Sequence, residues 1–335
     1  MKSELLYMIQ NDFPLTIRPF KVLADRLSSS EERVLEILRE EKENRVIRQI
    51  SPIYDTKRLG YSSTLVSFKI RKEDISDAVK IINSHPGVSH NYEREHPFNI
   101  WFTLAVPSDS KFGLEGTIKI LAKESRAIEY IILPTIKMFK IAVKLNVSGG
   151  GDKRERVSHK RRFKKIELDS RVKEIIALSQ VDIPLVEEPF KDTVEKLNMD
   201  YDEFFATLNR LKEAGVMRRF AGILNHKRAG FNANAMVVWD IDDSIAEEMG
   251  RVASSFKAVS HCYLRPRYQK WPYNLFTMVH GKSPEETNST ISDMAKEIKH
   301  FARRPLYSTK EFKKVRIKYF SKDFQLWENY KDNFI

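Results

Sequence analysis

The sequence predicts an α+β protein made of two tandem homologous halves, each with a helical module followed by a module of alternating strands and helices. An internal repeat predicts the two halves, because segments of the first half recur about 170 residues later. Apolar residues at helical spacing predict the helical module. A strand–helix–strand–strand–helix–strand order predicts the second module. We therefore expect two copies of one two-module unit that form a pseudo-twofold pair.

The repeat is visible as paired segments in corresponding order. Four pairs share the offset of 170 with no gap: Asn11–Leu15 with Val181–Leu185, Arg18–Lys21 with Glu188–Lys191, Val46–Arg48 with Val216–Arg218, and Lys57–Tyr61 with Lys227–Phe231. Farther along, Val88–Arg94 mirrors Val259–Arg265, and Pro97–Asn99 mirrors Pro272–Asn274 after an insertion of four residues in the second copy. Near the ends, Lys137, Phe139 and Lys140 echo Lys310, Phe312 and Lys313.

The first module of each half is predicted to be a winged helix-turn-helix, at residues 1–61 and 167–231. Leu23, Leu27 and Leu38 are typical of one helical face, and Phe204 and Leu208 repeat that spacing in the second copy. Serines before Glu31 predict a capped helix start there. An extended basic segment follows the helices in both copies, as a wing would.

The second module of each half, at residues 62–148 and 232–335, is predicted to be a ferredoxin-like βαββαβ domain. In the first copy a strand is expected at 63–70, a helix at 73–84, strands near 88–94 and 98–105, and a helix near 114–124. Apolar residues of the expected helix at 73–84 recur in the second half. A helix-turn-helix followed by such a sheet resembles the layout of the Lrp/AsnC regulators.

Charge and cysteine content narrow the range of partners. The net charge of the 335 residues is +12, which favours an anionic partner such as nucleic acid, a membrane surface or a polycarboxylate. Half of the excess lies in Gly149–Lys165, which opens with three glycines and predicts a basic flexible linker at 149–166 rather than an arm for nucleic acid. One cysteine, no signal peptide and no apolar stretch near ~20 residues predict a cytoplasmic protein without a membrane anchor.

The expected recognition helices argue against DNA as the partner. The segment Glu31–Glu43 holds six glutamates against three Lys or Arg residues, and the equivalent Asp202–Glu213 is also acidic. A DNA reader needs cationic and amide side chains at this position, because attraction to phosphates supplies most of the non-specific affinity. The glutamates are interpreted as a solvated helix face, which argues equally against DNA docking.

The motif Ser-His-x-Tyr-x-Arg occurs twice and carries the chemical prediction. On a strand, residues two and four apart share a face, so His90, Tyr92 and Arg94 are expected in one row, and His261, Tyr263 and Arg265 in another. At about 3.3 Å per residue each row spans roughly 13 Å, comparable to a tetrapyrrole ring. Aromatic and guanidinium groups together suit a flat ligand rimmed by carboxylates.

With its flanking segments, this motif resembles the siroheme decarboxylases, which are Lrp/AsnC-like proteins that act as two related subunits or as a fusion. The resemblance covers both halves and rests on FPL…RPF…R-[RQ]…K-R-x-G-[YF], followed by SH-x-Y-x-R and P-[FY]-N-[LI]-[WF]. It implies removal of the C12 and C18 acetate carboxyls of siroheme to give 12,18-didecarboxysiroheme. It also implies no separate cofactor or protein metal site, since iron comes with the substrate, although a histidine is a possible axial ligand.

Site residues are assigned on this basis. His261 is the first candidate for the proton donor, because an imidazole has an ordinary pKa of about 6.5. His226 is the second candidate, or an iron ligand, and Tyr263 is the third catalytic candidate. The predicted substrate-binding residues are Arg218, Arg219, Lys227, Arg228, Arg265, Arg267, Trp271, Tyr273, Asn274, His90, Arg94 and Arg48.

Structural interpretations stand beside these assignments. The wing arginines are equally consistent with solvated positions, the aromatic residues with core positions, and His96 and His280 with strand capping. Glu93 replaces Leu264 in the first copy, and Thr56 replaces His226, which favours the second half as the main site. Two other functions remain open: a tetrapyrrole sensor without catalysis, and an Lrp-type transcriptional regulator. A homodimer of the whole chain is also possible.

Overall fold

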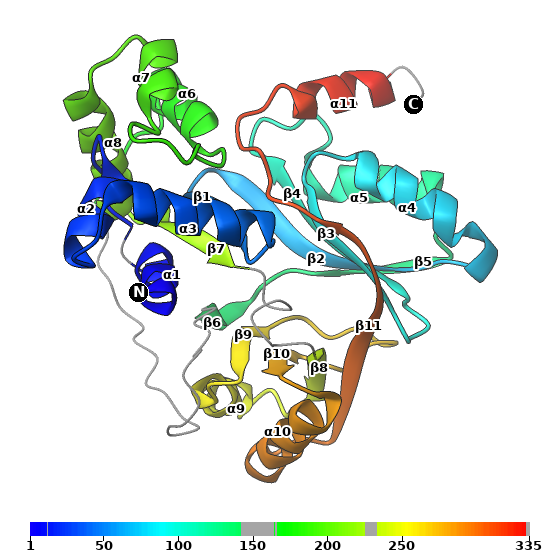
Figure 1. The fold of residues 1–335 in the computed structure, drawn as a ribbon. Coiled ribbons are helices and arrows are strands. Elements are labelled where there is room, and N and C mark those ends of the chain that lie inside the picture. Colours follow the sequence, from blue (N-terminus) through cyan, green and yellow to red (C-terminus); the bar gives the residue numbers. More distant parts are fainter. Residues whose placement is uncertain (12, 142–163, 165, 225–232, 333–335) are drawn as a thin grey trace. The chain divides into compact units, whose positions relative to one another are not determined.

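The computed structural model describes residues 1–11, 13–141, 164, 166–224 and 233–332 (Figure 1). It forms two compact units, which are described separately. The helical unit contains Met1–Tyr61, Arg161–Ala229 and Lys318–Lys322, and the sheet unit contains Ser62–Lys160, Gly230–Ile317 and Asp323–Ile335. Both halves of the sequence contribute to both units. The linker predicted at 149–166 lies outside the described residues except for 164 and 166.

The helical unit has three helices from each half. They are α1 (Lys2–Asn11), α2 (Pro19–Arg26) and α3 (Glu31–Glu43) from the first half, and α6 (Ser170–Ser179), α7 (Lys191–Leu197) and α8 (Tyr201–Glu213) from the second. The predicted start of α3 is confirmed, since the Ser30 hydroxyl accepts a hydrogen bond from the Arg33 amide at 3.2 Å. Asp200 caps α8 in the same way, at 2.7 Å from the Glu203 amide. The helix-turn-helix prediction is thus reproduced twice.

The acidic helix α3 is less solvated than its composition predicts. Glu31 and Glu41 are buried, and they form ion pairs with Arg18 and Lys2, respectively. The interpretation of the glutamates as a solvated face is therefore wrong for these two residues, because the helix packs them against cations of its own module. Glu32, Glu36, Glu40 and Glu43 remain exposed, so the outward charge of α3 is still predominantly negative.

The extended segments after the helices pair with each other. Strand β1 (Ile47–Tyr54) runs antiparallel to β7 (Met217–Leu224), with Ile53 opposite Arg219 (Figure 1). The α1 helix of the first half packs on β7 of the second, where a Cβ added to Gly222 would lie 2.6 Å from Ile9 Cδ1. The two helical modules therefore share one ribbon of sheet and one core.

The sheet unit repeats the predicted βαββαβ order. The first half supplies β2 (Tyr61–Lys69), a 3₁₀ turn (Lys72–Asp74), α4 (Ile75–Ser84), β3 (Val88–Arg94), β4 (Ile100–Pro107), α5 (Gly113–Glu124), β5 (Glu129–Leu133) and β6 (Lys137–Ile141). The second supplies β8 (Ala233–Asp240), α9 (Ala246–Ser255), β9 (Val259–Leu264), β10 (Leu275–Gly281), α10 (Pro284–Glu297), β11 (Ala302–Lys314) and α11 (Asp323–Asp332). The predicted fold class is confirmed in both halves.

The last strands of the two halves are exchanged. The nine strands lie in the order β5-β2-β4-β3-β11-β8-β10-β9-β6, so β6 of the first half pairs with β9, and β11 of the second half pairs with β3 (Figure 1). The registers agree with the sequence repeat: Lys140 lies opposite Cys262, and its counterpart Lys313 lies opposite Asn91. Each half-sheet is thus completed by a strand of the other half.

Two lysines, one buried and one half-buried, accompany the exchange. The Lys140 ammonium, 4% exposed, donates to the Phe256 carbonyl at the end of α9 at 2.8 Å. Its counterpart Lys313 donates to the Asn83 carbonyl at the end of α4 at 2.7 Å, and burial lowers the pKa of Lys313. Helix C-termini carry partial negative charge and carbonyls that need donors. Each half therefore caps a helix of the other.

The two faces of the sheet are covered differently. One apolar core comes mainly from the first half, with Phe68 and Phe102, and another mainly from the second, with Trp239 and Met249. Each also contains an aromatic side chain of the other half: Trp327 in the first core and Phe139 in the second. A third cluster mixes residues of both halves, including Trp101, Leu133, Trp271 and Leu306.

Within the described ranges, no helix is both long and apolar enough to cross a bilayer.

Candidate active site

The two His-Tyr-Arg rows form as the strand periodicity predicts. On β9 the rings of His261 and Tyr263 lie 6.1 Å apart, and the Arg265 guanidinium lies 4.9 Å from the Tyr263 ring centre. On β3 the corresponding distances, from His90 to Tyr92 and from Arg94 to Tyr92, are 6.3 and 5.6 Å. The duplicated sequence motif thus becomes a duplicated spatial arrangement, with each arginine stacked on a tyrosine.

The arginines of the two rows are anchored inside the sheet unit. Arg94 is 5% exposed and donates to the Leu306 carbonyl at 2.6 Å, whereas Arg265 is 8% exposed and donates to the Leu133 carbonyl. Each guanidinium therefore reaches a carbonyl of the other half. Burial lowers the pKa of both arginines to about 10. The Nε atoms of both residues have no hydrogen-bond partner in the described structure.

The polar residues after β9 are engaged with the protein itself. Arg267 binds Asp240 and, at 3.1 Å, Asp243, and it also donates to the carbonyls of Ile241 and Pro272. Carboxylates already occupy its guanidinium, so binding a substrate carboxylate would require replacing one of them.

The side chain of Asn274 is buried and hydrogen-bonds backbone groups of the protein. It is 2% exposed, accepts from the Ile241 amide at 3.1 Å and donates to the Ile241 carbonyl at 2.8 Å. Its counterpart Asn99 forms the same pair of bonds with Ile70, both at 2.9 Å. In both halves the asparagine of the repeated P-[FY]-N motif therefore hydrogen-bonds the start of one strand, β4 or β10, to the end of its neighbour, β2 or β8.

The aromatic candidates lie in or beside the mixed core. Trp271 is fully buried, with its ring centre 5.2 Å from that of Trp101, and its indole N–H has no partner in the described structure. Tyr273 is partly buried and packs against Trp271 at 5.0 Å. The sequence interpretation of Trp271 as a core residue fits this burial.

The basic candidates of the helical unit lie on its shared ribbon. Arg218 of β7 forms an ion pair with Asp55 at 2.9 Å. Arg219 lies opposite Ile53, and burial lowers its pKa. Arg48 of β1 is exposed. His226, Lys227 and Arg228 lie outside the described residues.

A polar network around His261 escaped the sequence analysis. The Ser260 hydroxyl lies 2.7 Å from His261 Nδ1 and 2.5 Å from His280 Nε2, and His280 Nδ1 lies 2.6 Å from the Asn234 side-chain oxygen. The members come from β9, β10 and β8, which are neighbours in the sheet. Ser260 was visible in the sequence as part of the repeated motif, and His280 was interpreted only as a strand-capping residue. Their proximity to each other and to Asn234 depends on strand order, which the sequence does not give.

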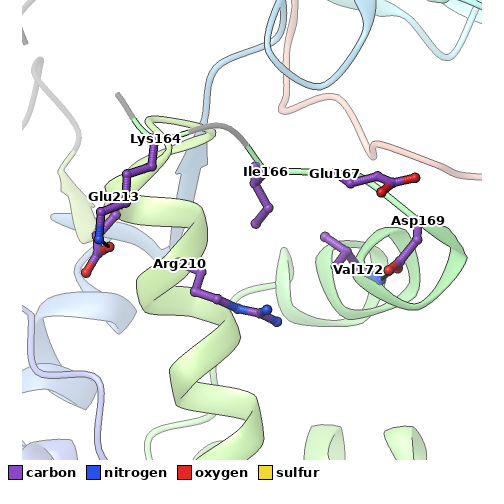
Figure 2. Close-up of a pocket in the computed structure, with 7 residues that line it drawn as sticks. All are labelled: Lys164, Ile166, Glu167, Asp169, Val172, Arg210 and Glu213. Carbon is purple, nitrogen blue, oxygen red and sulfur yellow. Dashed lines mark hydrogen bonds and ion pairs between the residues drawn. The ribbon is translucent and has the colours of Figure 1, made fainter. Parts of the chain in front are cut away.

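The helical unit contains a cleft of 410 Å³ beside α6 and α8 (Figure 2). It is lined by three carboxylates, two cations and two apolar residues: Glu167, Asp169, Glu213, Lys164, Arg210, Ile166 and Val172. Lys164 pairs with Glu213 at 2.6 Å, and Asp169 caps α6. None of the predicted site residues lines this cleft, and its carboxylates disfavour a polyanionic ligand.

In the described ranges, no group of three or more His, Cys, Asp or Glu residues is placed to hold a metal ion.

Comparison with known families first gives the class of protein. The AsnC-like ligand binding domain matches residues 58–140 and 228–313. The siroheme decarboxylase NirDL-like HTH domain matches residues 2–48 and 172–218. The chain is therefore a duplicated protein of helix-turn-helix and AsnC-like ligand-binding domains, as its fold indicates.

Full-length relatives then identify the family. The chain is 42% identical to a siroheme decarboxylase of Hydrogenobacter thermophilus over 97% of this chain and 96% of that protein. A siroheme decarboxylase beta subunit of Methanosarcina barkeri is 38% identical over 43% of this chain and 95% of its own length. The crystal structure of the siroheme decarboxylase NirDL covers 99% of this chain and 98% of its own, with a TM-score of 0.78 and 37% identity. The chain belongs to the siroheme decarboxylase family.

Proposed function

We propose that this chain removes the C12 and C18 acetate carboxyl groups of siroheme and releases 12,18-didecarboxysiroheme for d-type heme or alternative-route heme synthesis. The observation that carries the proposal is the similarity to a siroheme decarboxylase along nearly the whole of both chains. A NirDL structure in complex with an iron-uroporphyrin III analogue, 36% identical over 99% of this chain, adds support for a tetrapyrrole substrate.

The chemistry requires orientation, desolvation and one proton for each carboxyl lost. The bond between the acetate methylene and its carboxyl carbon breaks, CO₂ leaves, and the electron pair stays on the methylene, where the conjugated macrocycle delocalises it. A proton then forms the new methyl group. The protein contributes by fixing the remaining carboxylates, which holds the reacting arm in place. No cofactor besides the iron of the substrate enters this scheme.

His261 is proposed as the proton donor, with Tyr263 beside it. The half-buried position of His261, its contact with Ser260 and its repeat partner His90 support this assignment. His226 remains the second candidate, as donor or as axial ligand of the substrate iron. Arg48, Arg218, Arg219, Lys227 and Arg228 remain proposed carboxylate-binding residues, together with His90 and Tyr273. For Arg94, Arg265, Arg267, Trp271 and Asn274, burial or existing ion pairs favour a part in shaping the site.

The two halves are further proposed to act as a pseudo-dimer. Exchange of β6 and β11, the reciprocal lysine caps and the reciprocal arginine contacts support it. Relatives that match only part of this chain and are named as subunits are consistent with two separable halves. The domain boundaries at 61, 148, 166 and 231, the cytoplasmic location and a possible homodimer of the chain stay predictions.

Anaerobic incubation with siroheme followed by mass spectrometry tests the proposed activity. We expect two successive losses of CO₂ per macrocycle. Unchanged siroheme with a protein-bound absorption band would instead indicate a tetrapyrrole sensor. Retention on DNA that weakens with salt, without any tetrapyrrole binding, would indicate a regulator.

The variant His261→Ala tests the proton donor. We expect siroheme binding to remain while kcat falls by about 100-fold or more, because general acid catalysis contributes ~10²–10⁴-fold. Absorption titration gives the affinity, and product analysis gives kcat. His90→Ala makes the equivalent change in the first half; because His90 is proposed to bind a carboxylate, this variant should weaken siroheme binding rather than lower kcat by this factor. Unchanged turnover in His261→Ala would remove His261 from this role.

A further inference from the structure

We infer that Ser260, His280 and Asn234 are positioning residues that hold the His261 ring in one orientation and one tautomer for proton delivery. The inference rests on the proposed function, and it adds three residues to the site: Ser260 on the same strand as His261, and His280 and Asn234 on two further strands. It follows from a continuous line of short polar contacts, Asn234–His280–Ser260–His261, that crosses β8, β10 and β9.

The direction of the hydrogen bonds follows from the outer end of the line. The side-chain oxygen of Asn234 only accepts, so His280 Nδ1 must carry the hydrogen of their 2.6 Å contact. In a neutral His280, Nε2 is then the acceptor, and it takes the hydroxyl hydrogen of Ser260 at 2.5 Å. The Ser260 oxygen is left to accept from His261 Nδ1 at 2.7 Å. Each contact therefore determines the polarity of the next.

This polarity suits the proposed step. With Nδ1–H held by Ser260, the protonated His261 ring can release only the hydrogen on Nε2 without breaking the network. Transfer of that hydrogen to the methylene carbanion leaves His261 neutral, with the tautomer that the network already favours. No side chain has to rotate, so little reorganisation accompanies the transfer. Ser260 is 5% exposed, which keeps competing water away from the Nδ1 side of the ring.

The first half lacks this arrangement. Ser89 repeats Ser260 and lies 3.0 Å from His90 Nδ1, but its other partner is the hydroxyl of Thr103 at 2.7 Å. A threonine hydroxyl both donates and accepts, so it does not impose a direction on the serine. Ser63 stands at the position equivalent to Asn234, and Ala105 at the position equivalent to His280, since Ile70 and Asn99 correspond to Ile241 and Asn274. The network thus distinguishes the halves and assigns the ordered imidazole to the second one.

Two variants test the inference against two matched controls. Ser260→Ala removes the link, and His280→Phe removes the acceptor behind it. Ser260→Thr keeps the hydroxyl and serves as the conservative rescue, and Ser89→Ala makes the equivalent change in the first half. The readouts are siroheme affinity, KM and kcat, and the ring ¹⁵N chemical shifts of His261 in substrate-free protein labelled at histidine.

The expected result is a fall in kcat of about tenfold or more in Ser260→Ala and His280→Phe, with affinity and KM within about twofold. The ¹⁵N shifts should change from the Nδ1–H tautomer to a mixture in these variants, and Ser260→Thr and Ser89→Ala should resemble the wild type. Wild-type kcat with an unchanged His261 tautomer in Ser260→Ala overturns the inference, as does a His261 that is the Nε2–H tautomer in the wild type. Wild-type protein that leaves siroheme intact contradicts the proposed function instead, while the tautomer measurement still decides the inference about the network.

Discussion

His85 shows how one residue couples the stability of the sheet unit to pH. It is 1% exposed, its Nδ1 accepts the Gly87 amide at 2.9 Å, and its ring contacts Trp327 at 4.5 Å. Burial, with a smaller effect from the charge of Lys313, lowers the pKa of His85 to about 3. The accepting nitrogen requires the neutral ring, so the folded protein resists protonation here.

We predict that His85 makes the protein less stable as the pH falls below about 6.5. Between that value and about 3 the unfolded chain binds a proton that the folded chain refuses, so the free energy of unfolding falls by up to about 1.4 kcal/mol per pH unit. Denaturant titrations at pH 7 and pH 5 measure this loss. In His85→Leu the difference between the two pH values should shrink, even though the variant is less stable at pH 7. An equal pH dependence in both proteins would contradict the assignment.

Single residues of the site were partly predictable from sequence. The strand period of two placed His261, Tyr263 and Arg265 on one face because that relation is local. The anchoring of Arg94 and Arg265 was not predictable, since their carbonyl partners Leu306 and Leu133 belong to the other half of the chain. The contact of His280 with Ser260 was not predictable for the same reason, because sequence gives no strand order, and His280 was interpreted as a strand-capping residue.

At the scale of elements, α11 provides the clearest energetic case. This C-terminal helix contacts the core of the first half through Trp327, which is 7% exposed, and its Glu328 accepts from the Lys111 amide at 3.1 Å. Lys331 adds an ion pair with Glu124 at 2.5 Å. The final helix of the second half thus covers part of the first.

Trp327→Ala should therefore destabilise the protein by about 3 kcal/mol, because truncating a buried tryptophan typically costs ~3–5 kcal/mol and this one lies near the surface. Leu326→Ala, next to it on the same helix but 64% exposed, is the matched control and should change stability by no more than about 0.5 kcal/mol. Chemical denaturation measures both. Equal effects of the two changes would show that α11 does not contribute through Trp327.

The kinds of elements were predictable, whereas their partners were not. Helical spacing gave α3, with its serine cap, and the βαββαβ order followed from alternating strand and helix patterns. The pairing of β1 with β7 and the exchange of β6 and β11 depend on contacts between segments more than 100 residues apart. Such pairings leave no periodic signal in the sequence. The extended segments after the helices were therefore equally consistent with two separate wings.

At the scale of the whole molecule, the exchanged strands predict that the two halves associate without a covalent link. Co-expressed chains 1–141 and 164–335 should elute as a 1:1 complex in size-exclusion chromatography with mass detection. Expressed alone, the first half should aggregate, because β3 would lose β11 and present an open edge.

A charge reversal makes this experiment more specific. Lys140→Glu places a carboxylate against the Phe256 carbonyl and should weaken the complex of the two chains, whereas Lys123→Glu, at an exposed position of α5, should leave it intact. Two chains that elute as separate, stable monomers would contradict the dependence of each half on the other.

The continuous strand β11 also determines how the sheet unit comes apart. It pairs with β8 through its first residues and with β3 through its last, so one uninterrupted segment belongs to both half-sheets. Separation of β11 from β8 or from β3 disturbs the same continuous backbone. We therefore expect that neither half-sheet opens independently of the other. The most slowly exchanging amides of both halves are then expected to share one opening free energy, and heating should melt the duplicated sheet in a single transition.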